Sequence, residues 1–256
     1  MSKNINLVLS GGGARGIAHI GVIEELKKQG FIIKSISGTS MGALIGAVYA
    51  SGKLSEFKKW LFTLNKMDVF KMMDFTLSKQ GFIKGDKIFD KMSEFISDVN
   101  IEDLELPLAI SATNISTNSE VVFKTGDLFD AVRASISIPT VFTPVYKNND
   151  IIIDGGVINN LPISNIERFD GDLLVVVDVN RTQTDKERNS KLGFLDIMNK
   201  SLLLLMERVT ELSIEKYKPD IIINVSGESA KILDFHKAKY MVNIGKESVL
   251  NQLNNR

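Results

Sequence analysis

The 256-residue sequence predicts a layered α/β fold in a single domain. Strand and helix signals alternate along the chain without a repeat of fixed period or a low-complexity tract, which is typical of α/β proteins. Residues 173–179 form a nearly all apolar, largely β-branched run, as in a strand buried on both faces of a sheet. No stretch has the composition of a long linker. We therefore expect one domain over residues 1–256, with its core at about 5–226 and a C-terminal helix at about 231–253.

The chain begins with two strand–helix units. A strand is expected at residues 5–9, a helix at 14–29 closed by Gly30, a second strand at 32–37, and a helix of small residues to about residue 51. Farther along, the spacing of apolar residues predicts helices at 53–65, 86–97, 128–136 and 193–217, and strands at 106–114, 120–124, 141–146, 151–154, 173–179 and 221–225. Residues 182–191 are the most polar stretch and are expected to form a surface loop.

The composition argues against several classes of function. The 31 basic and 31 acidic side chains cancel, and the pI near 6.8 is unlike that of a general nucleic-acid binder. The absence of cysteine excludes disulfides, thiolate metal sites and a cysteine nucleophile. Only His19 and His236 are available, so no metal centre or other cofactor is expected. No secretory signal and no apolar run of ~20 residues is found, which predicts a cytoplasmic protein.

A glycine-rich loop follows the first predicted strand. The loop lies between a predicted strand and a predicted helix and contains Gly11, Gly12, Gly13 and Gly16. In such a loop several backbone N–H groups and the positive end of the helix dipole point toward one place, where they stabilise a negative charge. Their spacing matches the dinucleotide pattern GxGxxG, but residues 26–55 contain no Asp or Glu to hold a ribose. The oxyanion of acyl transfer is the second anion that such a loop can stabilise. A tight turn without a ligand is the remaining alternative.

A serine on a sharp turn follows the second predicted strand. Gly38, Ser40 and Gly42 match GxSxG between a strand and a helix, the context in which a serine hydroxyl projects as a nucleophile. The helix that starts near Met41 directs a second dipole toward the same space. A role as helix N-cap would explain the serine, but it would not explain the paired glycines.

A serine nucleophile requires a base within hydrogen-bond reach. The candidates are Asp154, His19 and His236. Asp154 follows an apolar strand and precedes Gly155 and Gly156, which lets the chain turn away so that the carboxylate projects from the strand end. A simple turn is the alternative for this aspartate. For His19, packing in the core is the favoured interpretation.

These three motifs, taken together, resemble the patatin-like phospholipases. The resemblance rests on GGGARG at 11–16, GTSMG at 38–42 and DGG at 154–156, in this order, and on the block ASISIP at 134–139. It covers about residues 6–225. The resemblance implies a three-layer α/β/α fold with a mainly parallel central sheet and a catalytic dyad without histidine, in which Ser40 is the nucleophile and Asp154 the base.

The resemblance also places the oxyanion hole in the glycine loop. The expected donors are the N–H groups of Gly11, Gly12 and Gly13, joined by that of Met41 at the start of the next helix. Arg15 is expected to hold the loop in place or to position a substrate. The glycines that support the motifs are Gly16, Gly38, Gly42, Gly155 and Gly156.

The activity expected from these motifs is hydrolysis of carboxylic esters of lipids, of phospholipase A, lysophospholipase or esterase type, through an acyl-serine. Two alternatives stay open. One is an α/β-hydrolase-type esterase with Ser40, Asp154 and His236 as its triad, and the other is a lipid-binding regulatory protein with little turnover. The expected partners are a lipid or acyl-ester substrate and a peripherally contacted membrane surface, self-association is left open, and nucleic acid is excluded.

Two apolar stretches lie outside the motifs. Residues 67–83 are rich in Met and Phe, which suits an acyl-chain channel or a membrane-facing lid. Ordinary core is the favoured alternative for this stretch, because exposed apolar patches are rare. The run at 202–206 is interpreted as core or as a subunit contact.

Overall fold

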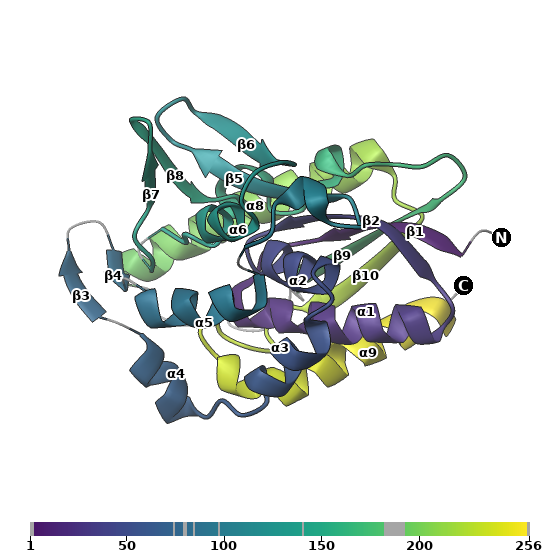
Figure 1. Cartoon of the computed structure of the whole chain (residues 1–256), viewed down its shortest axis with the longest axis horizontal. Coiled ribbons are helices and arrows are strands. Elements are labelled where there is room, and N and C mark those ends of the chain that lie inside the picture. The colour runs from purple at the N-terminus through teal and green to yellow at the C-terminus, as the bar shows by residue number, and fades with distance from the viewer. Residues whose placement is uncertain are drawn as a thin grey trace.

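The computed structural model describes residues 3–73, 75–78, 81–83, 85–96, 98–139, 141–181 and 193–254. The predicted surface loop at 182–191 lies outside these residues. Eight of the described strands form one sheet in the order β10-β9-β1-β2-β5-β8-β7, with β6 paired to β5 (Figure 1). The strands of this sheet are β1 Asn4–Leu9, β2 Ile32–Thr39, β5 Leu108–Asn114, β6 Ser119–Phe123, β7 Val145–Lys147, β8 Asp150–Asp154, β9 Leu173–Arg181 and β10 Ile221–Ser226.

The sheet is parallel over most of its width. Strands β10, β9, β1, β2 and β5 run in the same direction. Strands β6, β7 and β8 pair in antiparallel fashion at the β5 side. The prediction of a mainly parallel central sheet is confirmed.

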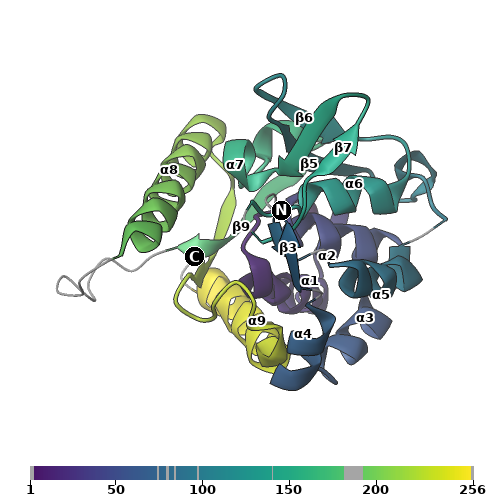
Figure 2. The ribbon, with the colours of Figure 1, turned by 90° about the vertical axis from the view of Figure 1, so that its left-hand side faces the viewer.

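Helices cover both faces of this sheet, as Figure 2 shows with α8 on one side and α1 and α9 on the other. The helices are α1 Ala18–Lys28, α2 Met41–Ala50, α3 Leu54–Leu61, α4 Lys66–Met72, α5 Asp86–Ile96, α6 Leu128–Ser135, α7 Gly156–Asn159, α8 Phe194–Tyr217 and α9 Ala238–Asn254. The predicted three-layer arrangement is therefore present.

Alternating side chains of the central strands divide the core between the two faces. On β1, Leu7 and Leu9 pack into the larger cluster together with α1, α2 and α9. Val8 points to the opposite face and packs with Val176 of β9 and Ile214 of α8. Because both faces of β1 are covered, its apolar residues are continuous rather than alternating with polar ones.

Strand β5 brings together the ends of two other strands. Ser111 pairs with Thr39 of β2 on one edge of β5 and with β6 on the other edge. The next residue, Ala112, also pairs with β6 on one edge, and on the other edge its partner is Asp154 of β8. Strands β2 and β8 therefore occupy the same edge of β5 and meet end to end, although they are far apart in sequence. The residue that follows Thr39 is thus placed beside Asp154.

Two predicted helices begin later than expected. Residues Gly13–Ile17 form a 3-10 helix that precedes α1, because Arg15 N–H bonds to the carbonyl of Gly12 rather than to one a full α-turn back. The C-terminal helix, predicted from about residue 231, starts at Ala238 after a short 3-10 turn at Phe235–Lys237.

The Met- and Phe-rich stretch at 67–83 divides into a helix and a hairpin. It contains most of α4 and two strands of a separate sheet, β3 Phe75–Ser78 and β4 Gly81–Ile83, which project from one end of the molecule in Figure 1. On α4, Val69 is buried, whereas Met67 and Phe70 are 59% and 60% exposed. This helix therefore presents apolar side chains to the core and to solvent. No helix in the described ranges has the length and apolar character needed to span a membrane.

Candidate active site

Ser40 occupies the turn between β2 and α2 in a strained conformation. Its φ of 54° and ψ of −122° are rare for a residue with a side chain, and such strain amounts to roughly 1–3 kcal/mol. The turn requires close backbone packing: a Cβ on Gly42 would lie 2.3 Å from the carbonyl oxygen of Leu9, and one on Gly38 would lie 2.6 Å from the nitrogen of Ala43. The GxSxG pattern thus corresponds to a sharp turn that only glycines at both flanks permit.

Three hydrogen bonds of the block at 134–139 hold the backbone of this region. The N–H of Ser40 donates to Ser135 Oγ at 2.8 Å, and Ser135 Oγ donates to the carbonyl of Ser111 at 2.6 Å. The N–H of Asp154 donates to the carbonyl of Ser137 at 3.0 Å. Ser135 is fully buried at the end of α6. One short segment therefore positions both the serine turn and the end of β8.

The carboxylate of Asp154 is almost completely removed from water, with 6% of the residue exposed. Its Oδ1 accepts a hydrogen bond from the N–H of Gly156 at 2.7 Å. Burial raises the pKa of Asp154 to about 6, although the Ser40 hydroxyl and the Gly156 N–H both act to lower it.

The Ser40 hydroxyl lies near enough to Asp154 to favour its ionised form. Among the described residues, however, Asp154 Oδ2 has no partner within normal hydrogen-bond geometry. Oδ2 is therefore a buried acceptor that no donor of the described residues occupies. Catalytic hydrogen bonds are commonly looser in the absence of a substrate.

The glycine loop presents backbone N–H groups to the same space. Gly12 and Gly13 line one cavity with Ser40, and in the described part of the chain their N–H groups make no hydrogen bond. Met41 is the first residue of α2, where the N–H has no partner within the helix. The N–H of Gly11 differs, because it donates to the carbonyl of Asn160 at 3.0 Å. Gly11 therefore anchors the loop and is not free to act as the oxyanion donor that the sequence suggested.

Arg15 and Asn180 hold the glycine loop from outside. Asn180 Nδ2 donates to the carbonyl of Gly11 at 2.6 Å, and Arg15 Nη2 donates to Asn180 Oδ1 at 2.7 Å. Arg15 Nη1 also donates to the carbonyl of Gly227, at 3.1 Å. Burial lowers the pKa of the Arg15 guanidinium, and the charge of Asp178 opposes this effect. These contacts give Arg15 the loop-holding role considered from the sequence.

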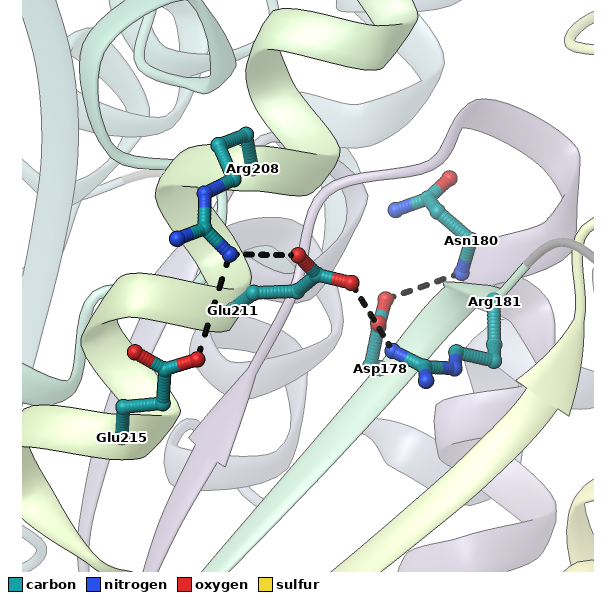
Figure 3. A network of polar contacts seen from close by, with 6 residues as sticks. All are labelled: Asp178, Asn180, Arg181, Arg208, Glu211 and Glu215. Atoms are coloured by element: carbon teal, nitrogen blue, oxygen red, sulfur yellow. Dashed lines mark hydrogen bonds and ion pairs between the residues drawn. The ribbon is translucent and has the colours of Figure 1, made fainter.

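The strand that carries Asn180 is also linked to α8 (Figure 3). Asp178 Oδ1 accepts a hydrogen bond from the N–H of Asn180 at 2.9 Å. Arg181 forms an ion pair with Glu211 at 3.7 Å, and Glu211 in turn pairs with Arg208 at 3.0 Å. Exposed pairs of this kind contribute little energy individually. They connect the C-terminal half of α8 to the strand end beside the site.

Ser40, Asp154 and the glycine loop line a cavity of about 260 Å³. Its lining also includes the segment around Ile138 and residues of α8. Polar walls come from Arg15 and from the amides of Asn160 and Asn180. The cavity thus combines a hydroxyl, a carboxylate and free N–H groups with both apolar and polar walls.

The leucine-rich run at 202–206 belongs to this cavity. Leu202, Leu203 and Met206 line it, whereas Leu204 and Leu205 are 64% and 66% exposed. The core interpretation of the run is wrong, because all four leucines are at least 39% exposed. A subunit contact at this run stays a prediction.

Neither histidine takes part in this arrangement within the described residues. His19 is fully buried, its Nε2 lies 2.8 Å from the carbonyl of Ser10, and burial lowers its pKa to about 4. His236 lies in the 3-10 turn before α9 and does not line the cavity of Ser40 and Asp154. The prediction of His19 as a core residue is confirmed, and the geometry gives no support to a triad with His236.

Comparison with known proteins decides the family. Residues 7–165 match the family model of the patatin-like phospholipases. The chain belongs to the patatin-like phospholipase family. Its fold is similar to that of VipD from Legionella pneumophila, with a TM-score of 0.56 and 16% identity over 99% of this chain and 67% of VipD.

Related patatin-like chains extend beyond the matched region. An uncharacterized NTE family protein of Mycobacterium tuberculosis is 36% identical over 190 residues, which are 74% of this chain and 53% of the relative. Lysophospholipase nte1 of Aspergillus fumigatus is 31% identical over 206 residues, 77% of this chain and 14% of the relative. The chain therefore spans about half the length of the mycobacterial relative and a small part of the fungal one.

Several residues that build the patatin-like site were not singled out by their own sequence pattern. Ser135 was noted only as part of a block, and its link to Ser40 spans 95 residues of sequence. Asn160 follows the Asp-Gly-Gly motif closely, and Asn180 ends a predicted buried strand. A polar amide at the end of an otherwise apolar strand was the available signal for Asn180.

Proposed function

We propose that this protein is a serine hydrolase that cleaves carboxylic esters of lipids through a dyad of Ser40 and Asp154. The observation that carries the proposal is the meeting of β2 and β8 on one edge of β5, which places Ser40 beside Asp154. The unengaged N–H groups of Gly12 and Gly13 line the same cavity. Membership of the patatin-like phospholipase family and the similarity to a lysophospholipase support a lipid ester as the substrate.

In the proposed reaction, Asp154 accepts the hydroxyl proton of Ser40 as Oγ attacks the ester carbonyl carbon. The tetrahedral intermediate collapses when its carbon–oxygen bond to the alcohol breaks, and the proton passes from Asp154 to the departing alcohol. A water molecule then attacks the acyl-serine and gives its proton to Asp154. The second collapse releases the carboxylic acid and restores the Ser40 hydroxyl. The steps balance without a cofactor or an oxidant.

The glycine loop supplies much of the rate enhancement in this proposal. A carboxylate with a pKa of about 6 is ionised at neutral pH but is a weak base for a serine hydroxyl. The developing oxyanion must therefore be stabilised by the N–H groups of Gly12, Gly13 and Met41. Each such donor contributes on the order of 3 kcal/mol in other acyl-transfer enzymes.

Labelling with a fluorophosphonate tests the proposed function. We expect one equivalent to add to the wild-type protein and none to Ser40→Ala. The matched control is Ser116→Ala, which removes a hydroxyl on the turn after β5, away from the cavity. Absence of labelling in the folded wild type would refute the proposal.

Turnover separates the hydrolase from a lipid-binding regulator of little activity. We expect p-nitrophenyl esters to be hydrolysed over many cycles, with the rate lost in Ser40→Ala and in Asp154→Asn. A stoichiometric burst without further turnover would favour the regulator. His236→Ala should retain activity, and its inactivation in a folded state would restore the triad.

We also propose that the N-terminal half of α8 rests on a lipid surface. Four of its apolar side chains, Ile197, Met198, Leu204 and Leu205, are between 52% and 66% exposed. Between positions 197 and 206 the one charged residue is Lys200, and the acidic residues Asp196 and Glu207 lie just outside this stretch. The same half of the helix borders the cavity that contains Ser40. A lipid taken from such a surface would enter the site directly.

Sedimentation with phosphatidylglycerol vesicles tests this contact. We expect Leu204→Ser combined with Leu205→Ser to lower the bound fraction at least tenfold, because burial of one leucine contributes roughly 1.5–3 kcal/mol. Leu250→Ser on α9 is the control for an exposed leucine elsewhere. If the double variant changes oligomer mass in light scattering while vesicle binding persists, a second copy of the chain covers this surface instead.

A further inference from the structure

The cavity that contains Ser40 adjoins a smaller apolar cavity, which in turn adjoins a third. The second cavity, of about 30 Å³, shares Gly13, Ser40, Ile138 and Ile232 with the first. Ser40 therefore lies at the boundary between the large cavity and the smaller one.

A third cavity, also of about 30 Å³, follows the second. The two have four lining residues in common, Met41, Ile88, Met92 and Phe235. The three cavities form a series that leads from the polar walls around Arg15, past Ser40, to the region beneath α3 and α4.

We propose that the acyl chain of the substrate occupies the second and third cavities, and that the alcohol part occupies the large one. This inference rests on the proposed function and assigns the two sides of the ester to opposite sides of Ser40. The substrate class it implies is an ester with a linear aliphatic acyl chain.

The chemistry of the walls supports this assignment. Every residue that lines the third cavity is aliphatic, aromatic or methionine, and Trp60 carries the one polar atom among their side chains. The large cavity has a mixed lining, in which Arg15, Asn160 and Asn180 form a polar wall beside apolar residues of α8. Arg15 and Asn180 are bonded to the glycine loop, so this wall gives an alcohol or head group a polar surface and not a set of free donors. An alkyl chain gains free energy for each methylene that leaves water, so the apolar series is the better place for it.

The free N–H groups are also consistent with an acyl chain in the second cavity and an alcohol in the large one. Gly13 and Met41 line the second cavity, and Gly12 lines the large one. The ester carbonyl is thereby placed at the boundary, with its acyl carbon chain leading toward Met41 and its alcohol oxygen toward Asp154.

Methionines form the narrow part of the series. Met41 and Met92 lie between the second and third cavities, and Met72 of α4 lines the far end together with Val69. Unbranched thioether side chains change rotamer readily, so they can move aside for an alkyl chain that the small free volume does not yet accommodate. We expect α4, whose Val69 and Met72 line the third cavity, to limit the length of chain that fits. Residues 67–83 thus contribute to the acyl site through α4.

The test compares kcat/KM for p-nitrophenyl acetate, butyrate, octanoate and laurate. In the wild type we expect the value to rise by up to about fourfold for each methylene that the channel accepts, and then to level off. Ile88→Phe adds bulk where the second and third cavities meet. It should lower the laurate-to-acetate ratio of kcat/KM at least tenfold.

A second variant and a matched control make the outcome decisive. Met92→Ala widens the narrow part and should move the preferred chain to a longer ester. Met241→Ala removes the same atoms from a fully buried position on α9 outside these cavities, and should leave the chain-length profile unchanged.

Two results would overturn the inference. One is a chain-length profile that stays parallel to the wild type in both Ile88→Phe and Met92→Ala. The other is a profile that responds to Leu203→Phe instead, which would place the acyl chain against α8 in the large cavity. In either case continued ester hydrolysis would leave the proposed function intact. Loss of all hydrolysis and of fluorophosphonate labelling in the wild type would refute both.

Discussion

Replacement of Asp154 by asparagine should stabilise the protein at neutral pH while it removes activity. The carboxylate has a raised pKa of about 6 in the folded state, against 3.8 for the same group in water. The folded protein therefore binds this proton more tightly than the unfolded chain does, so the wild type loses stability as the pH rises from about 4 to about 6. Two pKa units correspond to about 3 kcal/mol, since each unit is worth about 1.36 kcal/mol.

The asparagine variant carries no charge at this position and keeps an oxygen that can accept the Gly156 N–H. The difference in free energy of unfolding, variant minus wild type, should be zero or negative at pH 4. It should rise by up to about 3 kcal/mol by pH 8. For a chain of this length the corresponding change in the Tm difference is about 6–12 °C. Activity and stability are in conflict at such positions because a buried charge is needed for the chemistry.

Urea denaturation at pH 4, 6 and 8 measures the effect. The quantity of interest is the change with pH in the stability difference between variant and wild type, which cancels contributions that do not titrate. Asp170→Asn, on an exposed turn, is the control for replacing a carboxylate that is in contact with solvent. A difference for Asp154→Asn that is constant, or that falls toward pH 8, would refute the raised pKa and with it the burial of an ionised base.

Three further outcomes follow from the site. The kcat/KM for p-nitrophenyl butyrate should rise about tenfold from pH 5 to pH 7 and then level off, because Asp154 acts as a base with a pKa of about 6; a midpoint near pH 4 would contradict this. Ser135→Ala should lower kcat about 10–100-fold with little change in KM, since an unpartnered Ser40 N–H costs about 1–3 kcal/mol, and Ser135→Thr should restore part of the rate. Gly42→Ala should destabilise the protein by at least about 1–3 kcal/mol in urea and abolish fluorophosphonate labelling, because its Cβ would meet the Leu9 carbonyl; wild-type stability in this variant would show that the turn can relax.

Much of the fold follows from local signals in the sequence. The apolar strands, the glycine loop and the GxSxG turn were predictable because each depends on residues that are close in the chain. The strand at residues 173–179 was recognisable for the same reason, since burial on both faces leaves a continuous apolar run. The start of the final helix was misplaced because residues 231–237 are apolar enough to extend its pattern, yet they turn before Ala238.

The remaining features depend on contacts that no local pattern encodes. Nothing in the sequence relates Ser135 to Ser40, or Asn160 to Gly11, because both pairs form only after distant segments pack together. The leucines at 202–205 illustrate the opposite error. An apolar run on a helix was taken as a sign of burial, but Leu204 and Leu205 are mostly exposed beside the cavity. The hydrophobicity of a side chain alone does not indicate whether it is buried in the protein or exposed at its surface.

The hydrogen bonds that shape the serine turn also set the order in which this region can assemble during synthesis. Ser40 is made before both of the groups that hold its surroundings, because the hydroxyl that accepts its N–H belongs to residue 135 and the amide that holds the glycine loop belongs to residue 180. A nascent chain that ends before residue 180 lacks the amide that holds the glycine loop, and one that ends before residue 135 also lacks the hydroxyl that holds the serine turn. The proposed active site can therefore assemble only after the strand that carries Asn180 has been made.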